Sequence, residues 1–142
     1  MTIKSILEGK TYEIISVGPT MTVTDAIALL AEKRIGAVPV VEGGAVVGIF
    51  SERDVIYGLA GKGQAFLAEK VGTVMTSPAL SVAPDSAIIA GLSLMTRRRI
   101  RHLPVVDGEK LVGFVSIGDL VKHRIDKIES EAESMRDYIQ SA

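Results

Sequence analysis

Short runs of consecutive apolar residues dominate the hydrophobic pattern of the chain. Residues 38–41 and 45–50 are two such runs, and the turn residues Glu42-Gly43-Gly44 separate them. Apolar runs of this length on either side of a glycine turn are typical of two antiparallel strands joined as a hairpin. A shorter run at 14–17 ends at Gly18-Pro19, and it predicts a further strand.

Apolar residues with helical spacing predict a helix on each side of this hairpin. The segment before the hairpin has one apolar face, formed by Ala26, Ile27, Leu30 and Ala31. Either Thr22 or Thr24 can cap the start of that helix. A second helix is predicted after Ser51, and Gly58 together with the glycines at 61–63 is predicted to end it.

The second half of the sequence repeats the first. Residues 35–59 and 100–124 align at a constant offset of 65 without a gap, and nine of the 25 pairs are identical. The identical pairs include Pro39 and Pro104, Gly48 and Gly113, Ser51 and Ser116, and Asp54 and Asp119. The offset gives the second repeat strands at 80–82, 103–106 and 111–115 and a helix at 85–98. We predict an α/β (α+β) fold in which two β-α-β-β-α repeats pack about a pseudo-twofold axis.

The repeat divides the chain into four parts. They are the first repeat with the N-terminal segment (1–63), a connector (64–78) with a helix at 65–70, the second repeat (79–124) and a C-terminal helix (125–142). A heptad-like apolar stripe predicts that this last helix continues toward residue 140: Val121, Ile125, Ile128, Ala132, Met135 and Ile139. We expect its distal half to dock on a partner chain. The alternative is that the helix folds back on its own module.

Composition narrows the classes of function. The 142 residues are 47% hydrophobic but only 4% aromatic, which predicts an aliphatic core. Sixteen basic and 17 acidic residues give a net charge of −1, which argues against a nucleic-acid partner because that surface needs a basic excess. The sequence has no cysteine and no apolar stretch of membrane-spanning length. We therefore expect a cytoplasmic protein that does not contact a membrane.

The candidate chemistry lies where a strand passes into a helix in each repeat. Both junctions have the form Gly-h-h-Ser-x-x-Asp, where h is apolar: Ser51 and Asp54 in the first repeat, Ser116 and Asp119 in the second. A serine at a helix start lies beside free N–H groups that attract anions, and a carboxylate one turn later can accept both hydroxyls of a ribose. The alternative interpretation is a helix cap that needs no ligand. The duplication favours binding.

Two packed repeats are expected to leave a cleft between them, and basic residues distinguish one side of it. Arg101 and His102 are expected to face it, whereas their counterparts Gly36 and Ala37 carry no charge. This asymmetry indicates one phosphate-binding side. The arginines at 97–99 need no function, because cations are favourable at a helix C-terminus. No histidine–carboxylate spacing predicts a metal site, and no nucleophile motif predicts an enzyme such as a nucleotide hydrolase.

Over residues 2–124 the chain resembles a tandem pair of CBS domains, called a Bateman module. The resemblance rests on two Pro-Val-Val-(Glu or Asp)-Gly turns, the two serine–aspartate junctions, and Val17-Gly18-Pro19 with Val82-Ala83-Pro84 upstream. It implies a stand-alone module that holds adenine nucleotides in two clefts between the repeats. AMP is the expected ligand, and ATP and NAD(H) are the alternatives. In this family the junction aspartate binds ribose and the serine contacts phosphate.

Carried over to this sequence, the resemblance implies two sets of binding residues. The first site would combine Ile49, Ser51, Arg53 and Asp54 with Ala79, Leu80, Ile100, Arg101, His102 and Pro104. The second would combine Phe114, Ser116 and Asp119 with Ile14, Ile15, Ile35, Gly36, Ala37 and Pro39. Arg101 and His102 match the basic pair that holds phosphates in the gamma subunit of AMP-activated kinase. The second set departs from this basic pattern, because Gly36 and Ala37 carry no charge and Gly118 replaces Arg53. We therefore do not expect it to hold a phosphate as the first set does, but a nucleoside or one half of a dinucleotide would still fit there.

Two hypotheses of function follow. The first is a regulatory module without chemistry of its own, in which a bound nucleotide changes the surface shown to an effector protein. We expect it to form a homodimer, a flat disc of four repeats like other CBS pairs. The second hypothesis is a scaffold whose repeats serve dimerisation without any ligand.

Overall fold

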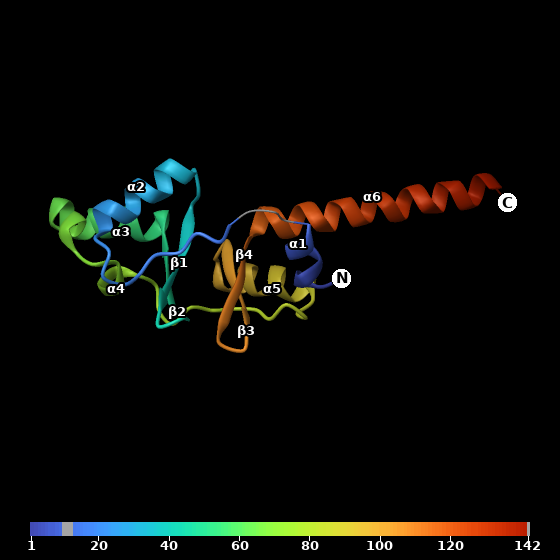
Figure 1. Cartoon of the computed structure of the whole chain (residues 1–142). Helices are drawn as coiled ribbons and strands as arrows, with labels where there is room; N and C mark the ends of the chain where they lie inside the picture. Colours follow the sequence, from blue (N-terminus) through green and yellow to red (C-terminus); the bar gives the residue numbers. More distant parts are fainter. Residues whose placement is uncertain (10–12, 142) are drawn as a thin grey trace.

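The chain folds into two small α/β repeats followed by one long helix (Figure 1). The structure is a computed structural model that describes residues 1–9 and 13–141. Its elements are α1 (Ile3–Glu8), α2 (Val23–Lys33), β1 (Ala37–Glu42), β2 (Ala45–Ser51), α3 (Glu52–Lys62), the 3-10 helix η1 (Gly63–Ala68), α4 (Val71–Val74), α5 (Ile88–Arg98), β3 (His102–Asp107), β4 (Lys110–Ser116) and α6 (Ile117–Ser141). The predicted class and the tandem arrangement of repeats are confirmed.

Each repeat contains one antiparallel hairpin, and the two hairpins have the same register. Val40 pairs with Gly48 in β1–β2, and Val105 pairs with Gly113 in β3–β4. The hairpins lie side by side at the centre of the molecule, where β2 contacts β4 (Figure 1). The helices of each repeat lie on the outer sides of this pair, so that the two repeats meet through their hairpins.

The first predicted strand of each repeat is reduced to a single bridge. Val17 forms one parallel bridge with Val40, and Val82 forms the equivalent bridge with Val105. The N–H of Val17 donates to the carbonyl of Pro39 at 3.1 Å. The ladder stops there because a proline follows two residues later in each repeat, and proline has no N–H to donate.

Several helix boundaries differ from the sequence expectation for local reasons. Thr22, not Thr24, caps α2 and accepts from the N–H of Asp25 at 3.2 Å. Helix α3 continues through Gly58 to Lys62, because Gly58 leaves the space against which the ring of Phe66 packs. The segment predicted as a helix at 65–70 is a 3-10 helix. Helix α5 begins at Ile88 rather than at residue 85, since residues 83–86 form a hydrogen-bonded turn.

Each repeat has its own core, and the N-terminal helix belongs to that of the second; the buried residues of the second core are aliphatic or Met as predicted, but the first core also buries two phenylalanines. In the first repeat Val38, Val40 and Phe50 are buried against α2 and Phe66. In the second, Ile3 and Ile6 of α1 are buried with the residues Ile88, Met95, Leu103, Val105, Val115 and Leu120. The sequence analysis missed α1, which is only six residues long. It precedes the first repeat in the sequence but packs on the second.

Helix α6 begins in the second repeat and then leaves it. Leu120 is its only buried residue in the described part, and from 128 to 141 every residue is exposed. Figure 1 shows the helix projecting away from both repeats to the C-terminal tip. The helix therefore does not fold back on its own module; residue 142 of the predicted segment lies outside the described residues. No helix in residues 1–9 and 13–141 is long and apolar enough to span a membrane.

Candidate ligand-binding site

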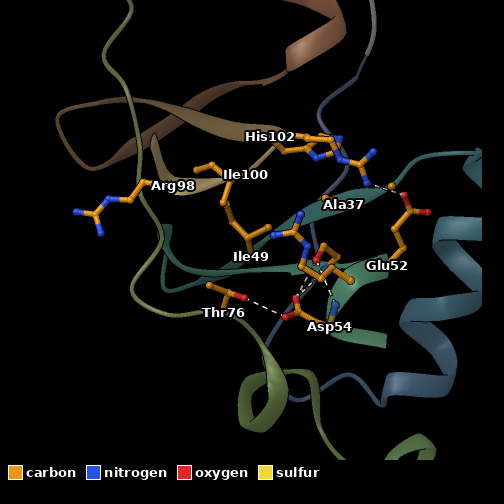
Figure 2. A pocket seen from close by; sticks show the side chains of 12 residues that line it. Ala37, Ile49, Glu52, Asp54, Thr76, Arg98, Ile100 and His102 are labelled. Atoms are coloured by element: carbon orange, nitrogen blue, oxygen red, sulfur yellow. Dashed lines mark hydrogen bonds and ion pairs between the residues drawn. The ribbon is translucent and has the colours of Figure 1, made fainter. Parts of the chain in front are cut away.

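A cavity of about 280 Å³ lies between the two repeats (Figure 2). The first repeat contributes the start of β1 and the junction between β2 and α3, the connector contributes Thr76, and the second repeat contributes residues between Arg98 and His102. The cavity brings together seven residues of the first predicted set: Ile49, Ser51, Arg53, Asp54, Ile100, Arg101 and His102. Residues separated by about 50 positions in sequence thus line one space, as the family resemblance implies.

Asp54 is held in a fixed orientation at the floor of this cavity. Its Oδ2 accepts from the backbone N–H of Ser51 at 2.9 Å and from the Ser51 hydroxyl at 3.1 Å. In return the Ser51 hydroxyl caps α3 by accepting from the N–H of Asp54. The remaining oxygen, Oδ1, accepts from the hydroxyl of Thr76 at 3.0 Å (Figure 2). Asp54 therefore already binds one hydroxyl group from the cavity side, which is the interaction a ribose hydroxyl would make.

The helix-cap interpretation and the binding interpretation are thus not exclusive. The reciprocal Ser51–Asp54 capping box is present, and it uses one carboxylate oxygen while the other one points to Thr76. A capping box alone requires no partner for that second oxygen.

The cations of the cavity come from both repeats and have different roles. Arg53 donates to the carbonyl of Arg99 at 2.7 Å, which ties the start of α3 to the end of α5. Arg101 forms an ion pair with Glu52 at 3.4 Å, and both side chains remain more than half exposed (57% and 59%). An ion pair this exposed contributes about 0–1 kcal/mol. Arg101 can therefore exchange Glu52 for a phosphate at low cost.

His102 lies between the first cavity and a second one of about 460 Å³. Its ring stacks on Phe114 with centroids 5.6 Å apart and an interplanar angle of 11°. Burial of the ring, and next the charge of Arg101, lower the pKa of His102 below its ordinary value, against the opposite effects of Glu52 and Asp119. The neutral, stacked imidazole therefore forms an aromatic wall shared by the two cavities.

The second cavity contains most of the second predicted set. The lining includes Ile14, Ile15, Ile35, Gly36, Ala37, Phe114, Ser116 and Asp119. Asp119 accepts from the N–H of Ser116 at 2.8 Å, and the Ser116 hydroxyl accepts from the N–H of Asp119 at 3.1 Å. This is the same reciprocal arrangement as in the first repeat, and it likewise places a carboxylate at the wall of a cavity.

Four predicted residues do not line either cavity. Pro39 and Pro104 are buried in their strands, and their carbonyls accept hydrogen bonds from the N–H groups of Val17 and Val82. Ala79 is also outside the lining, and Leu80 packs against the core of the second repeat instead. Thr76, which lies three residues before Ala79 in the sequence, lines the first cavity in place of Ala79 and Leu80.

Five lining residues were missed by the sequence analysis. They are Glu52, Thr76 and Arg98 in the first cavity and Glu13 and Arg34 in the second. Arg34 could have been found, because the repeat offset pairs it with Arg99 and both adopt positive φ at the end of a helix (55° and 54°). The second cavity is therefore not devoid of basic charge, although Gly36 and Ala37 supply none. Within the described residues no cluster of side chains could hold a metal ion.

Two hairpin-containing repeats with cavities at their interface define a tandem α/β module. The sequence model of the CBS domain matches residues 3–61 and 71–126 of this chain. The chain therefore belongs to the CBS domain family and contains two of its repeats.

Relatives and solved structures agree with this membership. The CBS domain-containing protein YhcV of Bacillus subtilis is 31% identical over 121 residues, which are 85% of this chain and 86% of the relative. The mitochondrial CBSX3 of Arabidopsis thaliana is 35% identical over 124 residues, 84% of this chain but 60% of the relative. Inosine-5'-monophosphate dehydrogenase of Mycobacterium leprae is matched over 22% of its length, at 33% identity.

The fold is also that of known CBS pairs. The CBS-domain containing protein ATU1752 of Agrobacterium tumefaciens has a TM-score of 0.83 and 37% identity, and the match covers 87% of this chain and 99% of that one. The CBS pair of protein MJ0100, whose structure holds 5'-methylthioadenosine and S-adenosyl-L-methionine, has a TM-score of 0.77 at 24% identity and covers 89% and 98%. At that identity the second likeness supports the fold alone.

Proposed function

We propose that this chain is a regulatory module that binds an adenine nucleotide of the AMP class in the first cavity and carries out no reaction of its own. The observation that carries the proposal is the meeting of Asp54 from one repeat with Arg101 from the other around one cavity. A fixed carboxylate suits a ribose, and an exchangeable arginine suits a phosphate. Neither repeat supplies both groups.

The contacts suggest how the nucleotide would be accommodated. The ribose hydroxyls would replace the hydroxyl of Thr76 on Asp54. The phosphate would take Arg101 from Glu52 and lie near the N-terminal end of α3, where backbone N–H groups favour an anion. Because these groups come from both repeats, a bound nucleotide would favour one relative arrangement of the repeats. That change of population is the signal we propose for an effector protein.

The second cavity suits a different part of a ligand. Its wall is the stacked pair His102–Phe114, and its charged lining residues Glu13, Arg34 and Asp119 include both signs. We propose that it takes a nucleoside or the second half of a dinucleotide such as NAD(H). The shared wall at His102, Gly36 and Ala37 would then let the two cavities influence each other.

Calorimetric titration of the full chain with adenosine, AMP, ATP, NADH and S-adenosylmethionine tests the proposal. We expect saturable binding of AMP and a higher thermal midpoint in its presence. Binding should be lost in Asp54→Ala and retained in Asp119→Ala, which removes the matching carboxylate from the other repeat. Equal AMP affinity in both variants would refute the assignment of the first cavity.

The alternative function is the ligand-independent scaffold. The groove between α2 and the start of α3, lined by Ile27, Leu30, Ala31, Ile35 and Val55, gives it a surface on which a second module could pack in a four-repeat disc. A chain that stays dimeric and shows no thermal shift with any of the five ligands would favour the scaffold. A change in the molar mass of the protein on addition of a ligand would show that ligand binding and dimerisation are coupled.

A further inference from the structure

The distal part of α6 has no packing partner within the described chain. Ile128, Met135 and Ile139 are exposed to 49%, 60% and 65%, although they lie on one stripe of the helix. Figure 1 shows this part of α6 surrounded by no other element. Residues 128–141 continue a helix that begins in the second repeat, so they need no nucleation of their own, but no tertiary packing stabilises them within the described chain. Burial of the stripe against a partner would stabilise this part of the helix.

The shape of the stripe fits one further helix. With Ile125, Ala132 and Ile139 at heptad position a, position d is occupied by Val121, Ile128 and Met135. The positions on the outer side (b, c and f) from residue 126 onward are all polar. A seam of only a and d residues is the surface of a coiled coil, whereas a helix that packs on a domain core has a wider apolar face.

The charged residues beside the a and d positions indicate which helix pairs with α6. We propose that α6 pairs with α6 of a second copy of this chain as a parallel, in-register coiled coil. In that arrangement a residue at position g lies beside the residue five positions later on the partner helix. Arg124 then faces Glu129 and Glu131 faces Arg136, and the twofold axis doubles both pairs. All four flanking pairs have opposite charges.

The antiparallel arrangement lacks this match. When all six apolar layers are aligned in opposite directions, positions e face e and positions g face g. Glu129 then meets Glu129, Glu131 meets Glu131, and Lys122 meets Arg136. Antiparallel registers with opposite charges exist only if the helices shift by a heptad, which leaves outer layers of the stripe uncovered. Charge and apolar coverage therefore agree only for the parallel pair.

The second repeat leaves room for this partner. At 100° per residue, the stripe centred on Val121, Ile128 and Met135 lies about a quarter turn from Leu120, which faces the core. The partner helix would thus lie beside the body of the repeat rather than beneath it. Glu131 also contacts Lys127 of its own helix at 3.8 Å; its second carboxylate oxygen can still accept from Arg136 of the other copy. This pairing does not depend on any ligand in the cavities.

Cysteine cross-linking of the full chain tests both the pairing and its direction, since the sequence has no cysteine of its own. We expect Ile139→Cys to form an intermolecular disulfide under mild oxidation, because only a parallel pair brings residue 139 within the roughly 7 Å between Cα atoms that a disulfide allows. In the six-layer antiparallel pair the two 139 positions are about 27 Å apart. Ser130→Cys, on the outer face, is the control and should stay uncross-linked.

Two outcomes of this experiment would overturn the proposal. If Ile139→Cys reacts only in a mixture with Val121→Cys, the helices pair in opposite directions. If Ile139→Cys reacts no more than Ser130→Cys, the stripe does not pair with a second copy at all. A failure of nucleotide binding would change neither outcome, so the two proposals are tested separately.

Charge exchange provides a second, independent test. The variants Arg124→Glu/Arg136→Glu and Glu129→Lys/Glu131→Lys each place like charges along the seam, at exposed positions that line neither cavity. We expect each variant alone to pair through α6 at least about tenfold more weakly, and their mixture to form heterodimers in native mass spectrometry. A statistical mixture of homodimers and heterodimers would contradict the assigned charge pairs.

Discussion

The two strand-to-helix junctions share their backbone chemistry and differ in their surroundings. Ser51–Asp54 and Ser116–Asp119 form the same reciprocal hydrogen bonds at equivalent places in the two repeats. The first carboxylate faces a cavity with Thr76 and an exchangeable arginine, whereas the second faces an aromatic wall. Duplication thus preserved the part that the fold itself requires, the helix cap. The side chains contributed by the opposite repeat are free to diverge, and these decide which part of a ligand fits.

The largest effect should come from replacing the two junction aspartates in turn. Asp54→Ala should weaken AMP about a hundredfold or more, because hydrogen bonds to a charged group contribute about 1.5–3 kcal/mol each and a ribose makes two. The fold should survive, since Ser51 still caps α3 and a carboxylate in the first helical turn contributes only about 0.3–1 kcal/mol. Asp119→Ala should cost the same stability but leave AMP affinity nearly unchanged. Calorimetry measures the AMP affinity of both variants, and thermal unfolding measures their stability. Equal losses of AMP affinity in the two variants would contradict the different roles of the two cavities.

A smaller effect is expected from Arg101, which should act on the phosphate and not on the nucleoside. Arg101→Ala removes one charge-assisted contact of about 2 kcal/mol, so AMP should bind some 30-fold more weakly. Adenosine should bind as to the unchanged protein. The matched control is Arg34→Ala, which removes a cation from the second cavity only. Equal losses for AMP and adenosine would mean that Arg101 shapes the pocket instead.

Glu52 should have a weaker effect with the opposite sign. Its carboxylate is the group that Arg101 contacts in the absence of a ligand, so Glu52→Gln should free the guanidinium and remove a negative charge near the phosphate. We expect AMP to bind about two- to fivefold more tightly, in line with the low strength of exposed ion pairs. Adenosine affinity should stay constant. Weaker AMP binding in Glu52→Gln would show that the glutamate orients Arg101 rather than competing for it.

The repeat offset was the sequence feature that made most of the fold predictable. It fixed both hairpins and their register, because identical turns and identical glycines repeat at 65 residues. Helix α1 escaped prediction although it is the counterpart of α4, because Ile3, Ile6 and Leu7 match Val71, Val74 and Met75 at an offset of 68 and not at the 65 of the repeat. The N–H of Ile3 donates to Ser86 as the N–H of Val71 donates to Met21. The bridge at Val17 was overestimated as a strand for a different reason: an apolar run does not reveal how many of its N–H groups find a partner.

The candidate site was predictable where one repeat dictates it and less so where two repeats meet. Ser51 and Asp54 follow from a local motif. Thr76 lines the cavity because its backbone pairs with Ile49 of β2, a contact across more than 25 residues that no local pattern predicts. No local pattern distinguishes Glu52 from other polar residues either. Pro39 lines neither cavity, because it is buried in β1, where its carbonyl accepts from the N–H of Val17. Family resemblance supplied the pairing of the repeats but not these individual contacts.

The smallest effect concerns pH and the shared wall between the cavities. Burial and Arg101 lower the pKa of His102, so between that lowered pKa and the ordinary value of 6.5 the unfolded chain binds more protons than the folded one. The contribution of His102 to the free energy of unfolding should therefore be at its maximum above pH 6.5 and should decrease as the pH falls below 6.5. A phosphate near His102 would favour the protonated imidazole and raise the pKa of His102 again. AMP should therefore bind slightly more tightly as the pH falls through the lowered pKa. Thermal unfolding from pH 7.5 to 5 should show a flatter profile in His102→Phe, which keeps a stacked ring, than in the unchanged chain. An equally steep profile in His102→Phe would show that the titration of another group limits stability in this range.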